Sequence, residues 1–367
     1  MKTLYVNLAQ RRYPIFVGGG LISDAGRLLA KQGFDSAPIV ITNSRIQRLH
    51  GATLEKSLQR ALGRAAIIRI GDGERFKNHS TLMKIYQGMF RVHADRRSWI
   101  LAFGGGVIGD IAGFAAATFM RGIPYVMAPT TLLAQVDSSI GGKVGINVTQ
   151  GKNLIGAFHQ PAAVLSDTQV LRTLPKRELA SGLYEVVKCG AIGSESLLSY
   201  LERRLSDILD CSAPEMEHVV VAAARIKADV VASDEKESKL RMILNYGHTV
   251  GHALEAATGY KRFKHGEGVA WGMLAALEFG RELGLLKTEA SERLIRLIHR
   301  VGPLPSLKGI GGGDLWNALI RDKKFRSGRT RMVFLRRLGG AEIRDDINDS
   351  SLQRFLRGFL ARGGRFV

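Results

Sequence analysis

The sequence predicts an α/β N-terminal domain with a parallel, Rossmann-like sheet, followed by a mostly α-helical C-terminal domain. Two patterns predict this fold. Short β-branched runs alternate with segments of helical period in the first third of the chain, and helical segments alone follow from about residue 171. Because 367 residues are enough for two domains, we expect them at residues 1–170 and 171–367.

Strands and helices alternate in order along the first domain. We expect strands over residues 38–42, 65–70, 98–103 and 123–128, and helices over residues 45–62, 80–92 and 107–120. Residues 1–8 also alternate like a strand. A series of this kind forms a parallel sheet, and its ligands gather at the carboxyl ends of the strands.

The second domain is expected to be helical over residues 176–192, 196–209, 215–231, 240–257, 267–283 and 290–301. The most apolar stretches, 111–120 and 268–279, are shorter than the roughly 20 residues that span a membrane. The N-terminus lacks the pattern of a secretory signal. Cys189 and Cys211 match neither a disulfide framework nor a zinc pair. We therefore expect free thiols and a cytoplasmic protein without membrane contact.

The net charge of +20 raises the question of nucleic-acid binding. Residues 1–100 carry 17 basic and 6 acidic side chains, residues 101–320 carry 23 and 22, and residues 321–367 carry 13 and 5. The excess therefore lies at the two ends, as scattered arginines without a zinc-finger, homeodomain or RNP motif. A solvated basic surface is the favoured interpretation, and no specific nucleic-acid partner is expected.

A glycine-rich turn, residues 103–110, follows one predicted strand and opens the next predicted helix. Its glycines let the backbone approach a pyrophosphate, and the helix N-terminus offers unpaired N–H groups. The turn matches G-x-G-x-x-G, but residues 111–136 contain no acid for the ribose. Asn43 or residues 71–74 would have to bind the ribose instead. A simple tight turn from strand to helix is the alternative.

Two further glycine-rich segments, residues 137–147 and 151–156, carry Lys143 and Lys152 in a loop-like setting. Ammonium groups in such surroundings suit a phosphorylated, hydroxyl-rich ligand. Surface lysines in mobile loops are the alternative.

Histidines and a glutamate in the second domain form a candidate metal site. His248, His252 and Glu255 have the i, i+4, i+7 spacing of one helical face, so spacing alone pairs His248 with His252 on one cation. His265 precedes another helix, and Glu185 lies inside an apolar one. The missing Glu of H-E-x-x-H argues against a metalloprotease. Structural histidines are the alternative.

Taken together, these segments resemble the 3-dehydroquinate synthase family of sugar-phosphate cyclases. The resemblance covers about residues 70–335 in one order, through residues 104–110, 120–122, 129–134, 137–147, 151–161, 173–175, 185–188, 245–255, 265–273 and 322–324.

The resemblance implies a dehydroquinate synthase-like fold and a homodimeric lyase that uses NAD and a divalent metal, zinc or cobalt. It would convert 3-deoxy-D-arabino-heptulosonate 7-phosphate into 3-dehydroquinate and phosphate, in the shikimate pathway to chorismate and the aromatic amino acids. The implied course is transient oxidation by NAD, phosphate elimination, re-reduction and intramolecular aldol closure.

The resemblance also implies roles for individual residues. The implied metal ligands are Glu185, His248 and His265. The implied catalytic residues are Asp137, Lys143, Lys188, Lys227, Arg241, Asn245 and His252. The implied substrate-binding residues are Arg121, Lys152, Asn153 and Lys323. The implied NAD-binding residues are Glu74, Lys77, Gly105, Gly106, Asp110, Thr130 and Thr131, together with Asn43, Lys143 and Lys152.

Three other functions are weighed against this one. A metal-dependent alcohol dehydrogenase of the glycerol type would share the plan, but a small neutral alcohol gives no reason to gather so many cations. A sibling cyclase acting on another sugar phosphate is separated less sharply, by Gly141, Gly142, Lys143 and His252. A nucleic-acid-binding protein rests on the net charge alone.

Overall fold

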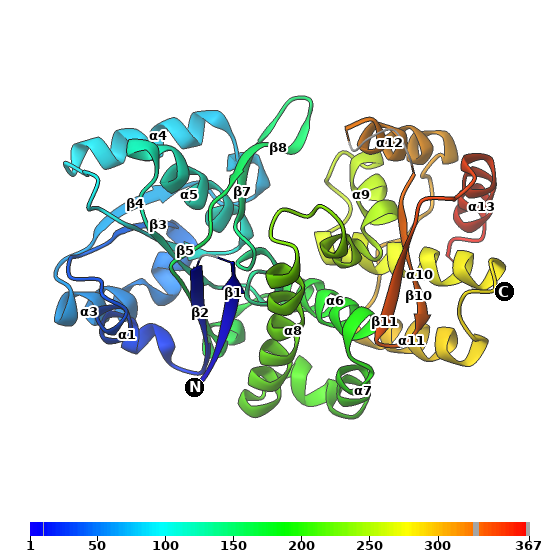
Figure 1. The fold of residues 1–367 in the computed structure, drawn as a ribbon, viewed down its shortest axis with the longest axis horizontal. Coiled ribbons are helices and arrows are strands. Elements are labelled where there is room, and N and C mark those ends of the chain that lie inside the picture. The colour runs from blue at the N-terminus through cyan, green and yellow to red at the C-terminus, as the bar shows by residue number, and fades with distance from the viewer. Residues whose placement is uncertain (10, 326–329, 365–367) are drawn as a thin grey trace. The chain divides into compact units, whose positions relative to one another are not determined.

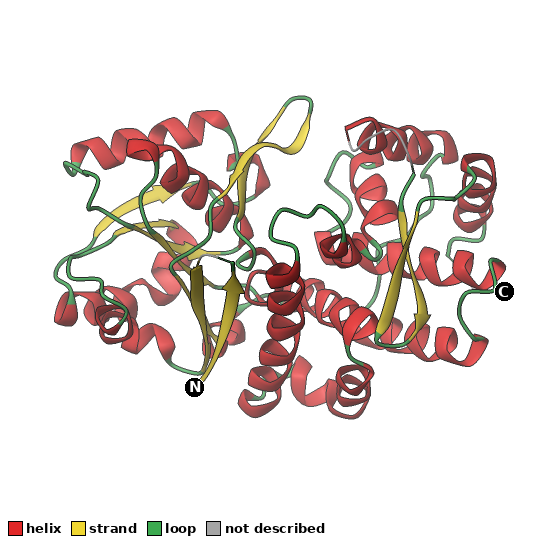
Figure 2. Cartoon of the chain, in the orientation of Figure 1, coloured by secondary structure: helices red, strands yellow, loops and turns green. Residues whose placement is uncertain are grey.

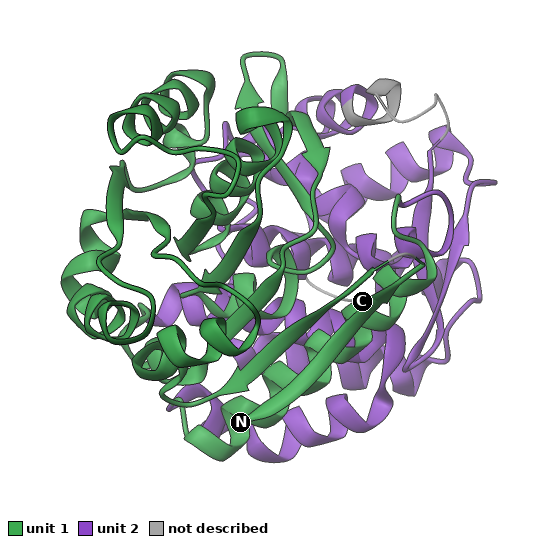
Figure 3. Ribbon diagram, turned by 60° about the vertical axis from the view of Figure 1, so that its left-hand side comes forward, with its two compact units in different colours: residues 1–175, 211–236 green, residues 176–210, 237–367 purple. Residues whose placement is uncertain are grey.

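The computed structural model describes residues 1–9, 11–325 and 330–364, and for residues 322–325 it describes the backbone alone. The chain divides into two compact units (Figure 3). Unit 1 comprises Met1–Pro175 and Cys211–Lys236, and unit 2 comprises Lys176–Asp210 and Glu237–Val367. Contacts thus group residues 211–236 with the first unit, whereas the sequence pattern assigned them to the second domain. The division into functional domains at residue 170 stays a prediction.

Unit 1 is built on a sheet with the order β1-β2-β9-β6-β5-β3-β4, of which Figure 1 labels β1 to β5. Its strands are β1 (Lys2–Leu8), β2 (Arg11–Gly18), β3 (Ile39–Asn43), β4 (Ala66–Ile70), β5 (Ile100–Gly104), β6 (Tyr125–Pro129) and β9 (Ala163–Asp167). Only β1 and β2 pair antiparallel, and the other neighbours pair in parallel. Strands β3, β5, β6 and β9 are buried throughout, as parallel strands covered on both faces should be. The predicted parallel sheet is confirmed.

Helices pack around this sheet (Figure 2). They are α1 (Ala25–Lys31), α2 (Ser44–Ile46), α3 (Ala52–Ala61), α4 (His79–Arg91), α5 (Gly106–Thr118) and α8 (Ala213–Ser233). Helices α1 and α3 bury leucines against Phe16, Trp99 and Phe103 in one apolar core. Helix α5 packs on β5 and follows it directly, so the glycine-rich turn lies at the carboxyl end of a central strand.

The glycine-rich segments expected to be loop-like form an antiparallel hairpin of β7 (Lys143–Val148) and β8 (Gly151–Phe158). Most of β8 is exposed, so the hairpin lacks the apolar alternation that would identify it in the sequence. Gly145 and Gly156 face each other in register. A Cβ on Gly156 would lie 2.2 Å from the Val144 carbonyl oxygen, so glycine is required there.

Unit 2 is mostly helical, as predicted. Its helices are α6 (Lys176–Gly193), α7 (Glu195–Leu209), α9 (His248–Ala257), α10 (His265–Glu282), α11 (Thr288–Val301), α12 (Gly312–Phe325) and α13 (Asp349–Ala361). A two-stranded sheet of β10 (Met332–Arg337) and β11 (Gly340–Arg344) accompanies them. Within the described residues, no helix is long and apolar enough to cross a membrane.

The prediction of a single helix over residues 240–257 was wrong. A 3₁₀ segment, Leu240–Asn245, ends before α9 begins at His248. Gly247 between them has φ +79°, and a Cβ there would lie 2.7 Å from the Val269 carbonyl oxygen. The break therefore comes from a left-handed glycine packed against α10.

Candidate active site

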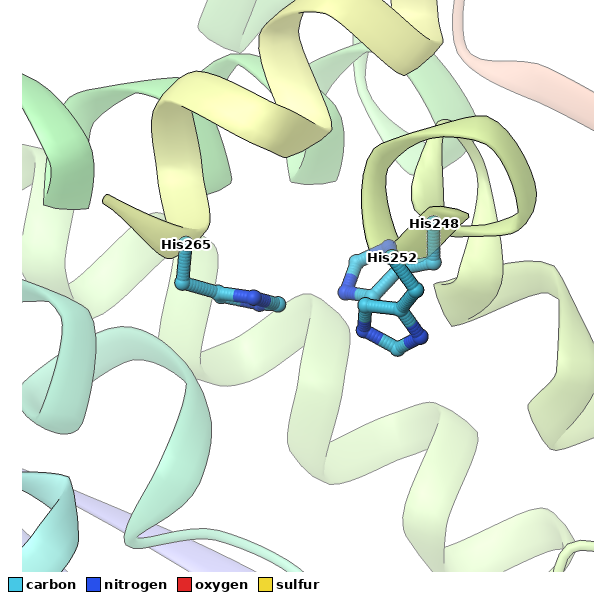
Figure 4. Close-up of side chains that lie close together, drawn as sticks. All are labelled: His248, His252 and His265. Carbon is cyan, nitrogen blue, oxygen red and sulfur yellow. The ribbon is translucent and has the colours of Figure 1, made fainter. Parts of the chain in front are cut away.

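A buried carboxylate and three imidazoles come together in unit 2. Glu185 lies in α6 and is fully buried. His248 and His265 are the first residues of α9 and α10, and His252 lies one turn into α9. Figure 4 shows the three imidazoles turned toward one another from these two helices. Their nearest ring nitrogens all lie within 4.8 Å of one another.

Glu185 is the point where two of these imidazoles converge. Its Oε1 atom lies 3.6 Å from Nε2 of His248 and 3.5 Å from Nε2 of His265. The other nitrogen of each ring has an acceptor. Nδ1 of His265 donates to Oε1 of Glu255 at 3.0 Å, and Nδ1 of His248 donates to the Tyr246 carbonyl oxygen at 3.2 Å. Two Nε2 atoms are thereby directed toward one carboxylate.

Burial and the neighbouring charges set the protonation of these rings in opposite directions. Burial, together with the Lys188 ammonium, lowers the pKa of His248 well below its usual value. Burial also opposes the charged form of His265, but hydrogen bonds to Glu185 and Glu255 outweigh it and raise the pKa to about 10. His248 is therefore a neutral imidazole at neutral pH, as a metal ligand must be.

This donor set fits a divalent cation such as zinc. Two imidazole nitrogens and one carboxylate oxygen are the ligands of many open zinc sites. A ligating histidine also usually donates its second nitrogen to a carboxylate or a carbonyl, as His265 and His248 do here. His252 lies close enough to take part, with its ring centre 5.2 Å from that of His248. The arrangement is therefore compatible with His248 sharing a cation with either His252 or His265.

Unit 2 also contains the cationic and polar residues Lys188, Arg241, Asn245 and Lys323, which are predicted to take part in catalysis or substrate binding. Lys188 is buried, and its ammonium lies 2.5 Å from Oε2 of Glu185. Arg241 is 2% exposed, in the 3₁₀ segment before α9. The amide of Asn245 donates to Glu237 at 3.0 Å. Lys323 lies in α12, but its side chain lies outside the described residues.

The candidate NAD site of unit 1 begins at the N-terminus of α5. Gly105 precedes the helix in extended conformation and forms no side-chain cap. A Cβ on Gly105 would lie 3.1 Å from the Thr131 methyl group, and one on Gly106 would lie 3.0 Å from the Ser138 hydroxyl. The two glycines thus keep side chains away from the first turn, which leaves its N–H groups accessible to an anion.

A buried lysine connects this helix to the hairpin. The ammonium of Lys77 contacts both Asp110 of α5 and the amide oxygen of Asn153 in β8. Burial raises the pKa of Asp110, although the Lys77 ammonium acts against the rise. Asn147 of β7 donates to Glu74 at 2.6 Å and accepts from the Asn153 backbone at 3.0 Å. The predicted residues Glu74, Lys77, Asp110 and Asn153 therefore form one polar network.

Other predicted residues of unit 1 lie at the carboxyl ends of strands. At the end of β3, the amide of Asn43 donates to Asp72 at 3.1 Å while its oxygen caps α2. Thr130 directly follows β6, and its backbone N–H donates to Gly104 at 3.0 Å. Thr131 accepts from the Ala134 backbone at 3.1 Å. These residues share the sheet edge that holds the N-terminus of α5.

Asp137 and Lys227 form an ion pair between the segment after β6 and α8. Lys227 is buried, and its helix belongs to unit 1. Lys143 is exposed at the start of β7, and Lys152 is half-buried in β8. Arg121 is exposed, with a left-handed φ of +69°.

Three residues that are not among the site residues implied by the family resemblance belong to these networks. Glu255 holds His265, Asn147 joins Glu74 to Asn153, and Asp72 holds Asn43. Helical spacing placed Glu255 on the histidine face, which could have indicated a supporting role. Asp72 belongs to residues 71–74, which the sequence already offered for the ribose. No local signal marks Asn147, because Glu74 lies far from it in the sequence.

Known proteins are similar to this chain over nearly its whole length. Profiles of the 3-dehydroquinate synthase N-terminal and C-terminal domains match residues 67–181 and 182–325. The chain is 44% identical to the 3-dehydroquinate synthase of Pelotomaculum thermopropionicum over 367 residues, 99% of each chain.

Two solved structures of sugar-phosphate cyclases are also similar. A 2-deoxy-scyllo-inosose synthase, complexed with carbaglucose-6-phosphate, NAD+ and Co2+, has a TM-score of 0.87 and 26% identity, covering 97% of this chain and 99% of its own. A 2-epi-5-epi-valiolone synthase from Streptomyces hygroscopicus, with NAD+ and Zn2+ bound, has a TM-score of 0.86 and 27% identity, covering 95% and 97%. The chain belongs to the 3-dehydroquinate synthase family.

Proposed function

We propose that Glu185, His248 and His265 hold the catalytic divalent metal, and that the N-terminus of α5 with its polar neighbours holds NAD. The chain is an NAD- and metal-dependent lyase that converts 3-deoxy-D-arabino-heptulosonate 7-phosphate into 3-dehydroquinate and phosphate. The observation that carries the residue assignment is the convergence of two Nε2 atoms, at 3.5 and 3.6 Å, on one oxygen of a fully buried carboxylate.

The metal and the nicotinamide together supply Lewis-acid and reversible hydride chemistry when bound. The protein's own contribution at the metal is orientation. Glu255 and the Tyr246 carbonyl fix the ring orientation of His265 and His248, so that Nε2 of each ring is the atom available for coordination. The Lys188 ammonium lies beside Oε2 of Glu185 and provides a positive charge next to this buried carboxylate.

NAD binding is assigned to groups around α5. The first-turn N–H groups of α5, which receive no side-chain cap from Gly105, suit the pyrophosphate, with Thr130 and Thr131 beside them. Glu74, Asn43 and Asp72 supply acceptors for ribose hydroxyls, since the turn itself has none nearby. We assign Lys77 and Asp110 to the support of this surface, together with Lys143 and Lys152.

The substrate is a phosphorylated hydroxy acid, so its binding requires several cations. We assign substrate contacts to Arg121, Lys143, Lys152, Asn153, Lys188, Lys227, Arg241, Asn245, His252 and Lys323. Asp137 is assigned to hold Lys227 through their ion pair. Phosphate elimination needs donors near the leaving group. His252 is proposed as one of them and not as a fourth protein ligand of the metal.

We also propose a homodimer in the cytoplasm. The family resemblance supports the dimer, and a biosynthetic reaction of the shikimate pathway fits the cytoplasm. Size-exclusion chromatography with light scattering tests the dimer directly.

One assay tests the catalytic proposal. The purified protein is incubated with the heptulosonate phosphate, NAD and zinc while phosphate release and NADH absorbance are followed together. Phosphate release without accumulating NADH is expected, because each turnover returns the hydride. Stoichiometric NADH would indicate a dehydrogenase instead.

A further inference from the structure

His265 begins a helix that its N-cap side chain does not stabilise. It is the first residue of α10, and Lys264 before it is the N-cap. A lysine side chain cannot accept a hydrogen bond from the helix N-terminus. The cap contact comes from Glu267 instead, whose Oε2 atom accepts from the Lys264 backbone N–H at 2.8 Å. The placement of His265 therefore depends on Glu267.

Glu267 is fixed by an arginine from another helix. Nε and Nη2 of Arg177, in the first turn of α6, donate to its two carboxylate oxygens at 2.6 and 2.8 Å. The same Nη2 donates to the Arg262 carbonyl oxygen at 2.8 Å. The Glu267 side chain is 4% exposed, while that of Arg177 is 52% exposed. One guanidinium thus binds both the cap of α10 and the backbone leading to it.

A second contact brings the start of α10 against α6. The Gly266 N–H donates to the Ser181 hydroxyl at 3.0 Å, and a Cβ on Gly266 would lie 1.9 Å from the Ser181 carbonyl oxygen. Arg177, Ser181 and Glu185 are spaced i, i+4, i+8, so they share one face of α6. That face therefore carries Arg177, which binds Glu267, and Ser181, which contacts Gly266. It also carries Glu185, whose Oε1 atom lies 3.5 Å from Nε2 of His265.

We propose that the Arg177–Glu267 pair is a positioning device that sets the distance between His265 and Glu185 and thereby the affinity for the metal. The inference rests on the proposed metal site. Neither residue contacts the metal in this proposal. They act by locking the first turn of α10 to the helix that supplies Glu185, so a looser pair allows the His265 imidazole to shift.

The test compares Arg177→Lys with Arg293→Lys. Arg293 is a matched control, because its Nε and Nη2 bind the two oxygens of Glu202 at 2.8 Å, elsewhere in the same unit. Cobalt is titrated into each metal-free protein, and its visible spectrum, its dissociation constant and the thermal unfolding midpoint are recorded. Glu267→Gln and His265→Ala complete the set.

Arg177→Lys and Glu267→Gln are expected to raise the cobalt dissociation constant about tenfold, as loss of outer-shell support commonly does, and to alter the cobalt spectrum. Arg293→Lys should lower the thermal unfolding midpoint about as much as Arg177→Lys does. It should change neither the cobalt dissociation constant nor the cobalt spectrum. If His265→Ala weakens cobalt binding but Arg177→Lys and Glu267→Gln do not, the positioning role is refuted. If His265→Ala leaves cobalt binding unchanged, the metal site itself is refuted.

Discussion

Glu255 should control metal affinity through His265, although it has no direct contact with the metal in the proposed site. Its Oε1 atom accepts from Nδ1 of His265 at 3.0 Å, and its side chain is only 5% exposed. A buried hydrogen bond to a charged group is worth about 1.5–3 kcal/mol. Since about 1.4 kcal/mol is tenfold in affinity, its loss corresponds to roughly 10- to 100-fold. Measured losses of such support fall in the same range.

We therefore expect Glu255→Gln to raise the zinc dissociation constant about tenfold and Glu255→Ala about 100-fold, in line with outer-shell losses. The glutamine amide still offers an acceptor but no negative charge, whereas alanine leaves Nδ1 of His265 buried without a hydrogen-bond acceptor. The dissociation constant is measured by competition with a coloured chelator at fixed pH. Glu278→Gln is the control, because Glu278 is a buried glutamate of α10 that pairs with Arg362.

Equal zinc affinity in Glu255→Gln, Glu255→Ala and the unsubstituted protein would refute this reasoning. It would also contradict the assignment of His265 as a ligand. An equal loss in Glu278→Gln would show that the effect comes from general loosening of the unit.

Three further predictions concern the metal and one concerns the substrate. A chelator should abolish turnover, and zinc or cobalt should restore it; full activity in protein that elemental analysis shows to be metal-free would contradict the site. His252→Ala should keep near-stoichiometric zinc but turn over slowly, whereas His265→Ala should lose zinc, and the opposite metal contents would favour the pair of His248 and His252. Because the pKa of His265 is raised to about 10 in the metal-free protein, zinc must displace one proton at neutral pH. Zinc affinity should accordingly rise by up to about tenfold per pH unit between about pH 6.5 and 8.5, and a flat profile would contradict this. Lys152→Ala and Lys323→Ala should each cost about 1.5–3 kcal/mol in kcat/KM for the phosphorylated substrate and should weaken NAD binding much less, and unchanged kinetics would mark both as surface lysines.

The central sheet could be predicted from the sequence because its strands are buried on both faces. Strands β3, β5 and β6 appear as short, nearly continuous apolar runs, and they lie within two residues of the predicted bounds. The β7–β8 hairpin gave no such signal, since Leu154, Ile155 and Phe158 are exposed on it. Its register depends on two facing glycines, which a local pattern cannot distinguish from those of a loop.

The break before α9 shows a similar limit. A single glycine within a helical pattern is often tolerated, so Gly247 did not argue against a helix over residues 240–257. The close approach of the Val269 carbonyl oxygen is what requires a left-handed glycine there. That contact joins segments from two helices, and it therefore leaves no trace in the local sequence.

The choice of metal ligands is likewise a tertiary property. Spacing places His248 beside His252, and the structure agrees, with ring centres 5.2 Å apart. However, a metal binds a particular nitrogen in a particular direction, and that direction is set by what the other nitrogen donates to. For His248 this acceptor is a backbone carbonyl before its own helix, and for His265 it is Glu255 on the neighbouring helix. Both arrangements direct Nε2 toward Glu185, which a third helix supplies. Helical spacing can therefore bring imidazoles together, but only the packing of α6, α9 and α10 can select which of them share one cation with a carboxylate.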